Sequence, residues 1–416
     1  MPVSNSVRPG FLRNLRDDID TSWPNVRVPL LIRRCLLPVA ILLSTSGCAV
    51  LQDMLPRDDA GARSGPRGAP PALASRASVD PISRNYFVLE SPEQSVIGEL
   101  QIVFTGPDDT FSDLAREYGL GYDELVHANP GIDPWIPAAG TPVLLPTQYV
   151  LPAAARRGIV LNIAAKRLFY FPEMPEGEPQ EVLTYPIGIG RVGWETPLGS
   201  AKVIQKARDP HWYVPTSVRK EHAEDGNPLP AVVPPGPDNP LGRHVLKLDM
   251  PGYLIHGTNQ PYGVGMRVSH GCVRLYPENI DTLYSLAGIG TDVAIVNQPY
   301  LLGRRDGQIF FESHPPLEDI EIDTAQHLDA LLQSLVNSEL LQTKRATAAA
   351  QMQTIAADAR GIPILLYKRD IDEIYERALV VHNTVEPDPD APTLAEVREL
   401  LDQPLAATDE QPEVVN

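Results

Sequence analysis

Short apolar segments separated by glycine and proline run from residue 158 to residue 296, and they restrict this region to a β-rich fold. Residues 158–163 and 167–171 have the length and composition of paired strands around a turn at residues 164–166. Further strands are predicted at residues 181–188, 201–204, 245–248, 253–256 and 292–296, and one helix at residues 277–286. Residues 209–239 are long, irregular and proline-rich, and loops of that length are often functional.

A cysteine and two histidines lie at the ends of predicted strands in this region. His256 ends an apolar strand just before Gly257, and Cys272 follows His270 and Gly271. A thiolate next to an imidazole base is a covalent nucleophile, and a nearby imidazolium lowers the pKa of a thiol. Gly271 permits a tight turn, so the amides of Gly271 and Cys272 are placed to form an oxyanion hole. The alternative for Cys272 is a buried structural thiol.

The N-terminal residues have the order of an export signal. A basic pair, a short apolar run and small residues precede Cys48, so residues 1–48 are predicted to be a signal peptide. The apolar run is too short to span a membrane as a helix. The residues before Cys48 resemble a bacterial lipoprotein signal, in which this cysteine is lipidated; an ordinary signal peptide is the alternative. In an exported protein, Cys272 would then be an unpaired and therefore candidate reactive thiol.

Residues 49–85 are rich in proline, glycine and alanine and are predicted to be a flexible linker. Residues 98–147 have a strand–helix–helix–strand pattern, with Thr110 and Asp113 at capping-box spacing before the first helix. This pattern resembles a LysM peptidoglycan-binding module. The usual Gly-Asp-Thr at the first turn is Asp108-Asp109-Thr110 here. Glycan binding and simple packing against a neighbouring domain therefore both stay open.

The C-terminal part of the chain is predicted to be mostly helical. Residues 298–316 form an appended hairpin around Asp306 and Gly307, and residues 317–385 form a helical extension. Within that extension a long helix is expected over residues 324–359 and a further helix up to about Val381. Residues 386–416 are acidic and contain prolines, which is typical of a disordered tail.

The cysteine and histidine segments resemble the L,D-transpeptidase catalytic domain (the YkuD fold). The resemblance rests on residues 256–258, which read His-Gly-Thr, and residues 269–275, which read Ser-His-Gly-Cys-Val-Arg-Leu. It implies a mainly β catalytic domain over residues 157–297, a YkuD-type β-sandwich with short helices. The small βααβ LysM-like module would precede this domain and the helical extension would follow it.

The same resemblance implies the roles of the site residues. Cys272 is the nucleophile and His256 its base, oriented by the backbone carbonyl of Gly257. Ser269 and His270 are expected to line the pocket, and Arg274 either holds a substrate carboxylate or braces the loop. The histidines at positions 211, 222 and 244 are expected at the surface. No cofactor is expected, and neither Cys272 nor the nine histidines form a metal-ligand pattern.

The reaction implied by the family is acyl transfer on peptidoglycan stem peptides. Cys272 attacks the third residue of a tetrapeptide stem and releases D-alanine. An amine of another stem, or a lysine of an outer-membrane lipoprotein, then accepts the acyl group. A hydrolase on the same scaffold and a non-catalytic wall-tethering lipoprotein are the alternatives. The expected location is periplasmic, with a lipid anchor in the outer membrane, and the net charge of −18 argues against nucleic acid as a partner.

Overall fold

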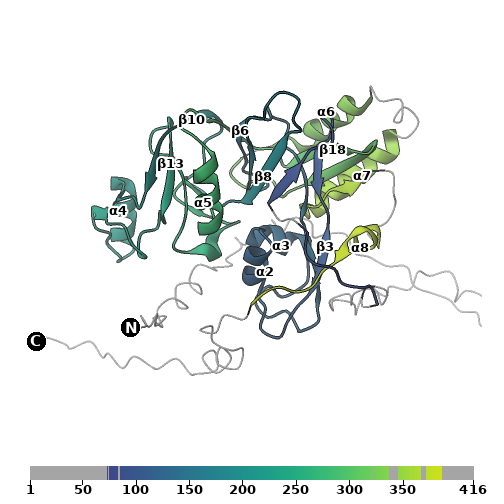
Figure 1. The fold of residues 1–416 in the computed structure, drawn as a ribbon, viewed down its shortest axis with the longest axis horizontal. Helices are drawn as coiled ribbons and strands as arrows, with labels where there is room; N and C mark the ends of the chain where they lie inside the picture. The colour runs from purple at the N-terminus through teal and green to yellow at the C-terminus, as the bar shows by residue number, and fades with distance from the viewer. Residues whose placement is uncertain are drawn as a thin grey trace, which may run out of the picture. The chain divides into compact units, whose positions relative to one another are not determined.

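The structure is a computed structural model that describes residues 73, 75–82, 85–320, 322–336, 345–366 and 372–386 (Figure 1). These residues belong to one compact unit. The predicted signal peptide with Cys48, the first part of the predicted linker and the predicted tail after residue 386 lie outside the described residues. Among the helices that are described, none has the length and apolar character needed to cross a membrane.

A nine-stranded mixed sheet occupies the region predicted to be β-rich, and each strand predicted between residues 158 and 296 is found in it. Neighbouring strands are antiparallel, except that β17 is parallel to β6 and β14 is parallel to β16. In sheet order the strands are β1 (Tyr86–Val88), β8 (Glu181–Pro186), β7 (Arg167–Phe171), β6 (Gly158–Asn162), β17 (Asp292–Val296), β10 (Gly199–Arg208), β13 (His244–Leu248), β14 (Leu254–His256) and β16 (Val273–Arg274).

Strand β10 joins two halves of this sheet. Its first four residues pair with β17, whereas Val203 and the residues after it pair with β13. The register shifts between Val203 and Gln205, and an irregularity of this kind bends a strand and increases its twist. The bend lets the two halves of the sheet face each other.

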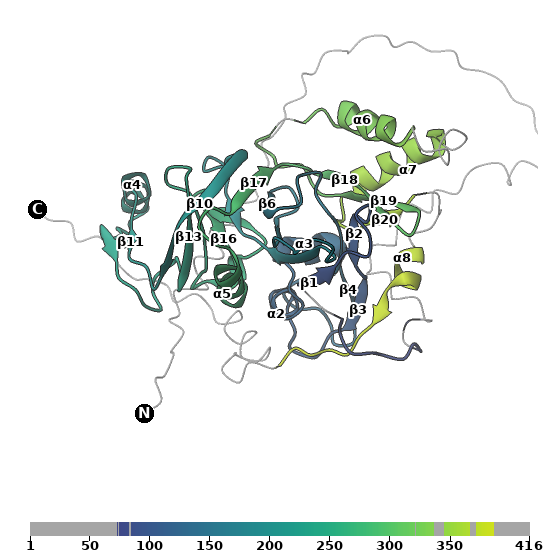
Figure 2. The ribbon, with the colours of Figure 1, turned by 45° about the horizontal axis from the view of Figure 1, so that its top comes forward.

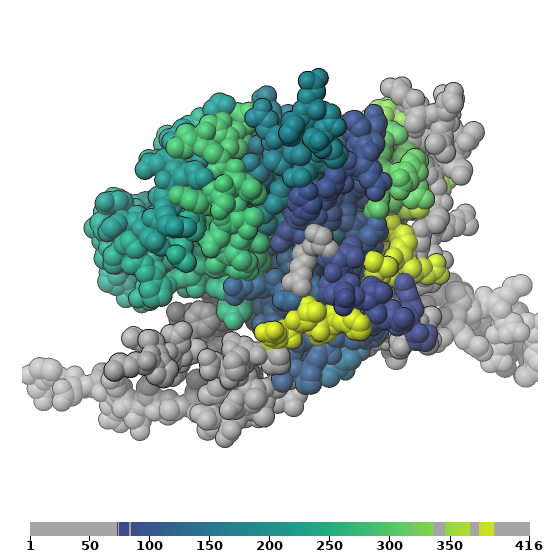
Figure 3. Space-filling view, viewed as in Figure 1, coloured from purple at the N-terminus to yellow at the C-terminus, as the bar shows by residue number. Residues whose placement is uncertain are grey.

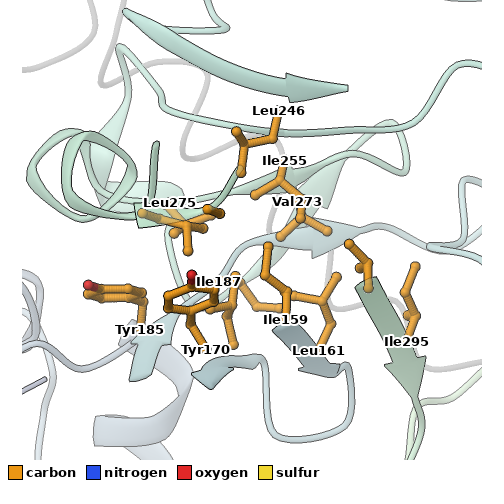
Figure 4. Close-up of a cluster of buried hydrophobic side chains, with 14 of the residues drawn as sticks. Ile159, Leu161, Tyr170, Tyr185, Ile187, Leu246, Ile255, Val273, Leu275 and Ile295 are labelled. Carbon is orange, nitrogen blue, oxygen red and sulfur yellow. The ribbon is translucent and has the colours of Figure 1, made fainter. Parts of the chain in front are cut away.

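One hydrophobic core fills the space between the two halves. Leu246, Ile255 and Val273 from the second half point toward Ile159 and Leu161 from the first half (Figure 4). Helix α5 (Pro277–Leu286), which was predicted with these bounds, adds buried side chains to the same core. Two facing β-layers with short helices fit the mainly β sandwich expected from the sequence.

The strand–helix–helix–strand pattern predicted for residues 98–147 is present. It consists of β3 (Gln101–Phe104), α2 (Phe111–Glu117), α3 (Tyr122–Ala128) and β4 (Pro142–Leu145). Thr110 caps α2: its hydroxyl accepts a hydrogen bond from the Asp113 amide at 3.3 Å, and its amide donates to the Asp113 carboxylate at 3.1 Å. The predicted capping box is therefore confirmed. We call these four elements the βααβ module.

The βααβ module shares a hydrophobic core with the large sheet. Val160, Phe169 and Val182 on the outer face of the sheet pack in one cluster with Phe111 and Leu114 of helix α2. Strands β6 and β7 are consequently buried on both faces, which explains their continuous runs of apolar residues. The module packs directly on the sheet that carries the cysteine segment.

Two terminal segments differ from their predictions. Residues 75–82 do not behave as a free linker, because the Val79 amide donates to Val380 at 2.9 Å and the His382 amide donates to Val79 at 3.0 Å. The predicted last helix ends earlier, with α8 (Asp372–Arg377), and is followed by strand β21 (Leu379–Val380), which pairs in parallel with β3. The helical prediction failed here because the edge of β3 satisfies the backbone of this segment, and that edge is distant in sequence. Figure 3 shows this segment in yellow against the module.

The predicted hairpin is present and carries the C-terminal helices. Asp306 and Gly307 both have positive φ values, 52° and 72°, as tight hairpin turns require. Two helices are described within the predicted helix over residues 324–359, and residues 337–344 between them lie outside the described residues. Both helices pack on the hairpin (Figure 2). The elements are β18 (Tyr300–Arg305), β19 (Gln308–Ser313), α6 (Thr324–Val336), α7 (Arg345–Asp358) and β20 (Ile364–Leu365), which pairs with β19.

The remaining elements are short. Strand β2 (Val96–Gly98) pairs with β5 (Gln148–Val150), and β9 (Ile189–Gly190) pairs in parallel with β15 (Arg267–Ser269). The long loop predicted to be irregular contains helix α4 (Thr216–Glu224) between the paired strands β11 (Trp212–Tyr213) and β12 (Val232–Val233). A single 3₁₀ turn, η1 (Pro261–Gly263), precedes β15.

A buried ion pair joins the module to the sheet. The Arg167 side chain on β7 is 1% exposed, and its Nε and Nη2 atoms donate to the two carboxylate oxygens of Glu124 on α3 at 2.6 and 2.7 Å. Nη2 also donates to the carbonyl of Gly119 at 3.1 Å, and the guanidinium lies 4.1 Å from the ring centre of Tyr149. Every one of these partners belongs to the module or to the segment that follows it.

We predict that Arg167→Met destabilises the protein strongly. The substitution leaves the Glu124 carboxylate buried without its partner, which costs about 3–5 kcal/mol of the free energy of unfolding. Urea unfolding followed by circular dichroism measures this loss. The control is Arg157→Gln, because the Arg157 side chain is 75% exposed and pairs with Asp292 at 3.3 Å; a change within about 1 kcal/mol is expected there. Equal effects of the two substitutions would contradict the prediction.

Candidate active site

The register of β14 and β16 determines which side chains share a face. Ile255 pairs with Val273, and His256 pairs with Arg274. Ile255 and Val273 point into the hydrophobic core, so His256 and Arg274 lie on the opposite face. Cys272 precedes Arg274 by two residues and lies on that face as well. The cysteine, histidine and arginine singled out from the sequence are therefore brought together by one pair of strands.

The turn before Cys272 requires a glycine. Gly271 has a φ of 97°, and a Cβ atom at this position would lie 3.0 Å from the ring of Tyr253 and 3.3 Å from the carbonyl oxygen of Glu195. Cys272 is a free, half-buried cysteine whose Sγ lies 3.6 Å from the carbonyl oxygen of Gly252. The turn thus presents the thiol at the N-terminal end of β16.

Ser269 braces this turn instead of lining a pocket, which corrects the prediction. Its side chain is buried, and its hydroxyl donates to the carbonyl of Cys272 at 2.6 Å. The same hydroxyl accepts from the Gly271 amide at 3.2 Å. Thr196 holds the other side of the turn, because its hydroxyl donates to the Gly271 carbonyl at 3.0 Å. Since the Gly271 amide is engaged, the expected oxyanion hole is left with the Cys272 amide as its donor.

His256 is buried and oriented by its own backbone. Its Nδ1 atom lies 2.6 Å from the carbonyl oxygen of Gly257, the contact expected from the sequence. Burial is the main cause that lowers the pKa of His256 to about 3; the charge of Arg274 adds to it, and the carbonyls of Gly257 and Leu241 oppose it. In the neutral ring Nδ1 donates to Gly257, so Nε2 keeps the lone pair that a base needs.

Cys272 is also neutral in the resting site. Burial raises the pKa of the Cys272 thiol, and the Leu254 amide and the charge of Arg274 offset this only in part. No hydrogen bond joins Cys272 to His256 in the part of the chain that the structure describes. The resting state is thus a thiol with a neutral imidazole on the same face, and the reactive ion pair has to form during the reaction.

Arg274 is a positive charge without a carboxylate partner among the described residues. Its Nε atom is buried and makes no hydrogen bond there. Burial lowers the pKa of Arg274, and the neighbouring Cys272 opposes this. A half-buried guanidinium with an unpaired Nε donor has the chemistry to bind a carboxylate.

His270 contacts residues that the sequence analysis did not single out. Its Nε2 atom lies 2.7 Å from a carboxylate oxygen of Glu221 on α4 and 3.2 Å from the guanidinium of Arg191. Trp194 packs edge-on against the imidazole, with ring centres 4.8 Å apart. Arg191 and Trp194 lie on the connection from β9 to β10, and Glu221 lies on the loop that looked irregular. No local pattern in the sequence marks these three residues.

The three histidines predicted at the surface differ from one another. His211 is exposed, as predicted. His222 lies 6.0 Å from the ring of His270, so it belongs to the surroundings of the site. His244 is buried, its Nδ1 atom contacts Asp281 on α5, and its ring centre lies 4.4 Å from that of Tyr284. The surface prediction for His244 was wrong because β13 places it against a helix that follows later in the chain.

Comparisons with known proteins show which family this chain resembles. Residues 156–295 match the family model of the L,D-transpeptidase catalytic domain, YkuD. The probable L,D-transpeptidase YcfS of Escherichia coli (strain K12) is 37% identical over 290 residues, which cover 68% of this chain and 89% of that protein. The chain belongs to the L,D-transpeptidase family.

Two further family members of the same strain are similar to this chain. The probable L,D-transpeptidase ErfK/SrfK is 36% identical over 284 residues, covering 66% of this chain and 88% of that protein. The probable L,D-transpeptidase YbiS is 38% identical over 240 residues, covering 56% of this chain and 76% of that protein. Within the described ranges of this family member, no group of three or more histidine, cysteine, aspartate or glutamate residues is arranged to hold a metal ion.

Only the thiolate reacts with iodoacetamide, and burial raises the pKa of the Cys272 thiol above its ordinary value of 9.0. We therefore predict that the rate at which iodoacetamide alkylates Cys272 still increases with pH above pH 9.0. Arg274→Gln removes a charge that lowers the pKa of the thiol, so its rate profile shifts to higher pH. Peptide mapping assigns the label to Cys272. Arg243→Gln, which changes an exposed arginine, is the control and keeps the original profile. A shift to lower pH in Arg274→Gln would contradict the proposed effect of the charge.

His256 is predicted to make the fold sensitive to acid. Between the unfolded pKa of 6.5 and the folded pKa of about 3, the unfolded chain binds a proton at His256 that the folded chain does not bind. The free energy of unfolding therefore falls as the pH falls through this window, by up to about 1.4 kcal/mol per pH unit. His256→Asn removes this contribution, so urea unfolding at pH values across the window should show a shallower loss. His211→Asn should keep the wild-type slope; an unchanged slope in His256→Asn would contradict the prediction.

Proposed function

We propose that this protein is a cysteine acyltransferase that acts on peptidoglycan stem peptides, with Cys272 as its nucleophile. The observation that carries the proposal is the common face of β14 and β16, which holds Cys272, His256 and Arg274 together. Membership of the L,D-transpeptidase family supports the same reaction class. No step of the proposed reaction requires a cofactor.

The first half-reaction forms a thioester. The Cys272 thiol passes its proton to Nε2 of His256, and the sulfur attacks the carbonyl carbon of the third residue in a tetrapeptide stem. The negative oxygen that develops there faces the Cys272 amide. The bond to the terminal D-alanine breaks, and its nitrogen leaves with the proton from His256. The unused donors of Arg274 are suited to the carboxylate of the stem.

The second half-reaction transfers the acyl group to an amine. A side-chain amine of another stem attacks the thioester carbonyl and gives a 3–3 cross-link, whereas a lysine of an outer-membrane lipoprotein would give an anchored protein. In both cases Nε2 of His256 takes a proton from the attacking amine, the bond between the carbonyl carbon and the sulfur breaks, and the proton passes to the departing Cys272 thiolate. Water in place of the amine would make the protein a hydrolase on the same scaffold. The products distinguish the two reactions, because hydrolysis gives a free tripeptide and transfer gives a cross-linked product.

We also propose that the protein acts in the periplasm as a lipid-anchored protein. The order of basic, apolar and small residues before Cys48 supports export and lipidation of this cysteine. The residue that follows is Ala49, and the proposed destination is the outer membrane. Metabolic labelling with a fatty acid, compared between the wild type and Cys48→Ala, tests this step.

We expect the wild type, and not Cys272→Ala, to release D-alanine from a disaccharide-tetrapeptide. Mass spectrometry follows the free D-alanine and the products. A cross-linked dimer identifies transfer between stems, and a free tripeptide identifies hydrolysis or a missing protein acceptor, which a lysine-bearing peptide then tests. Release by Cys272→Ala at the wild-type rate, or no release by the wild type, would refute the proposed function and favour a tethering role.

A further inference from the structure

The placement of helix α4 has little hydrophobic support. It lies between the two-residue strands β11 and β12, and Val218 is its one buried residue. Glu221 and His222 follow Val218 at three and four positions, so all three share one face of the helix. This face meets the cysteine segment, where the rings of His222 and His270 lie 6.0 Å apart.

One carboxylate on this face contacts two separate segments of the chain. The first oxygen of Glu221 accepts from the Nη2 atom of Arg191, and the second lies 2.7 Å from Nε2 of His270. The Arg191 backbone amide in turn donates to the carbonyl of Ser269 at 3.0 Å. Glu221 therefore closes a ring of contacts around the residues that immediately precede Cys272.

The charge state of Glu221 suits this role. Burial raises the pKa of its carboxyl, but the hydrogen bond to His270 and the charge of Arg191 outweigh burial and hold the pKa below its usual range. The carboxylate is thus ionised at neutral pH and requires a proton on Nε2 of His270. This contact selects the tautomer of His270 and restrains its ring against the edge-on Trp194.

We propose that Glu221 is a positioning residue for the nucleophile: by holding His270 and Arg191, it fixes the cysteine segment and the placement of α4 beside it. The kinetic part of this inference rests on the proposed function. The side chain of Glu221 makes its hydrogen bonds to Arg191 and His270, so it acts through His270, two residues before the nucleophile. Its loss should mainly lower kcat, because the thiol is displaced while the carboxylate-binding Arg274 stays in place.

The test compares Glu221→Gln with Glu224→Gln in the full-length protein solubilised in detergent. Glu224 is a matched control, because it lies on the same helix, is largely exposed and pairs with Lys220 at 3.7 Å. With the disaccharide-tetrapeptide, Glu221→Gln should lower kcat by about 10- to 100-fold with little change in KM. Glu221→Asp keeps the charge and should restore part of this loss, whereas Glu224→Gln should behave as the wild type.

Two further measurements separate positioning from a general effect on the fold. In a double-mutant cycle, the combined loss of Glu221→Gln and His270→Gln should be smaller than the sum of the two single losses, since both changes remove the contact between Glu221 and His270, whereas the contact of Glu221 with Arg191 is lost only in Glu221→Gln. Hydrogen exchange monitors α4 without any activity, and the amides of residues 216–224 should exchange faster in Glu221→Gln than in Glu224→Gln.

The outcomes are distinct. Wild-type kcat and unchanged exchange in Glu221→Gln would overturn the positioning role, and so would fully additive losses in the double mutant. A wild type that releases no D-alanine would refute the proposed function. The exchange comparison would still decide, in that case, whether Glu221 holds α4 in place.

Discussion

The parallel register of β14 and β16 is the constraint on which the site depends. Ile255 and Val273 are both buried in the central core, so a one-residue slip of β14 would bring His256 into the core, and a one-residue slip of β16 would move Val273 onto the open face. Burial of Ile255 and Val273 thus determines which face of the strands carries Cys272 and Arg274, although neither of these two side chains belongs to the core. Gly271 then fixes the turn that precedes the thiol, because its backbone conformation disfavours any residue with a side chain.

The surroundings of this strand pair explain its chemical state. Desolvation disfavours both the Cys272 thiolate and the His256 imidazolium. The positive charge of Arg274 favours the thiolate and disfavours the imidazolium. The resting site therefore stores a neutral thiol and a neutral base in place of an ion pair.

The regions outside the catalytic domain are built into the same body. The βααβ module shares a core with the outer face of the sheet, and Arg167 and Glu124 connect the two through a buried ion pair. The segment around Val380 extends the sheet of the module, while the last hairpin carries α6 and α7. These contacts show that the βααβ module packs against the large sheet.

The sequence by itself predicted the seven strands between residues 158 and 296, helix α5 and the hairpin at Asp306 and Gly307, and it singled out Cys272 and His256 as candidate site residues, because alternation, turn residues and a short motif are local properties. Only the tertiary structure decided that Ser269 is a buried brace, that His244 faces α5, and that residues 379–380 form a strand. It also brought Glu221 and Arg191 to His270 from 49 and 79 positions away in the chain. Such contacts depend on which strand edges and helix faces meet across the core, and no local pattern of residues contains that information.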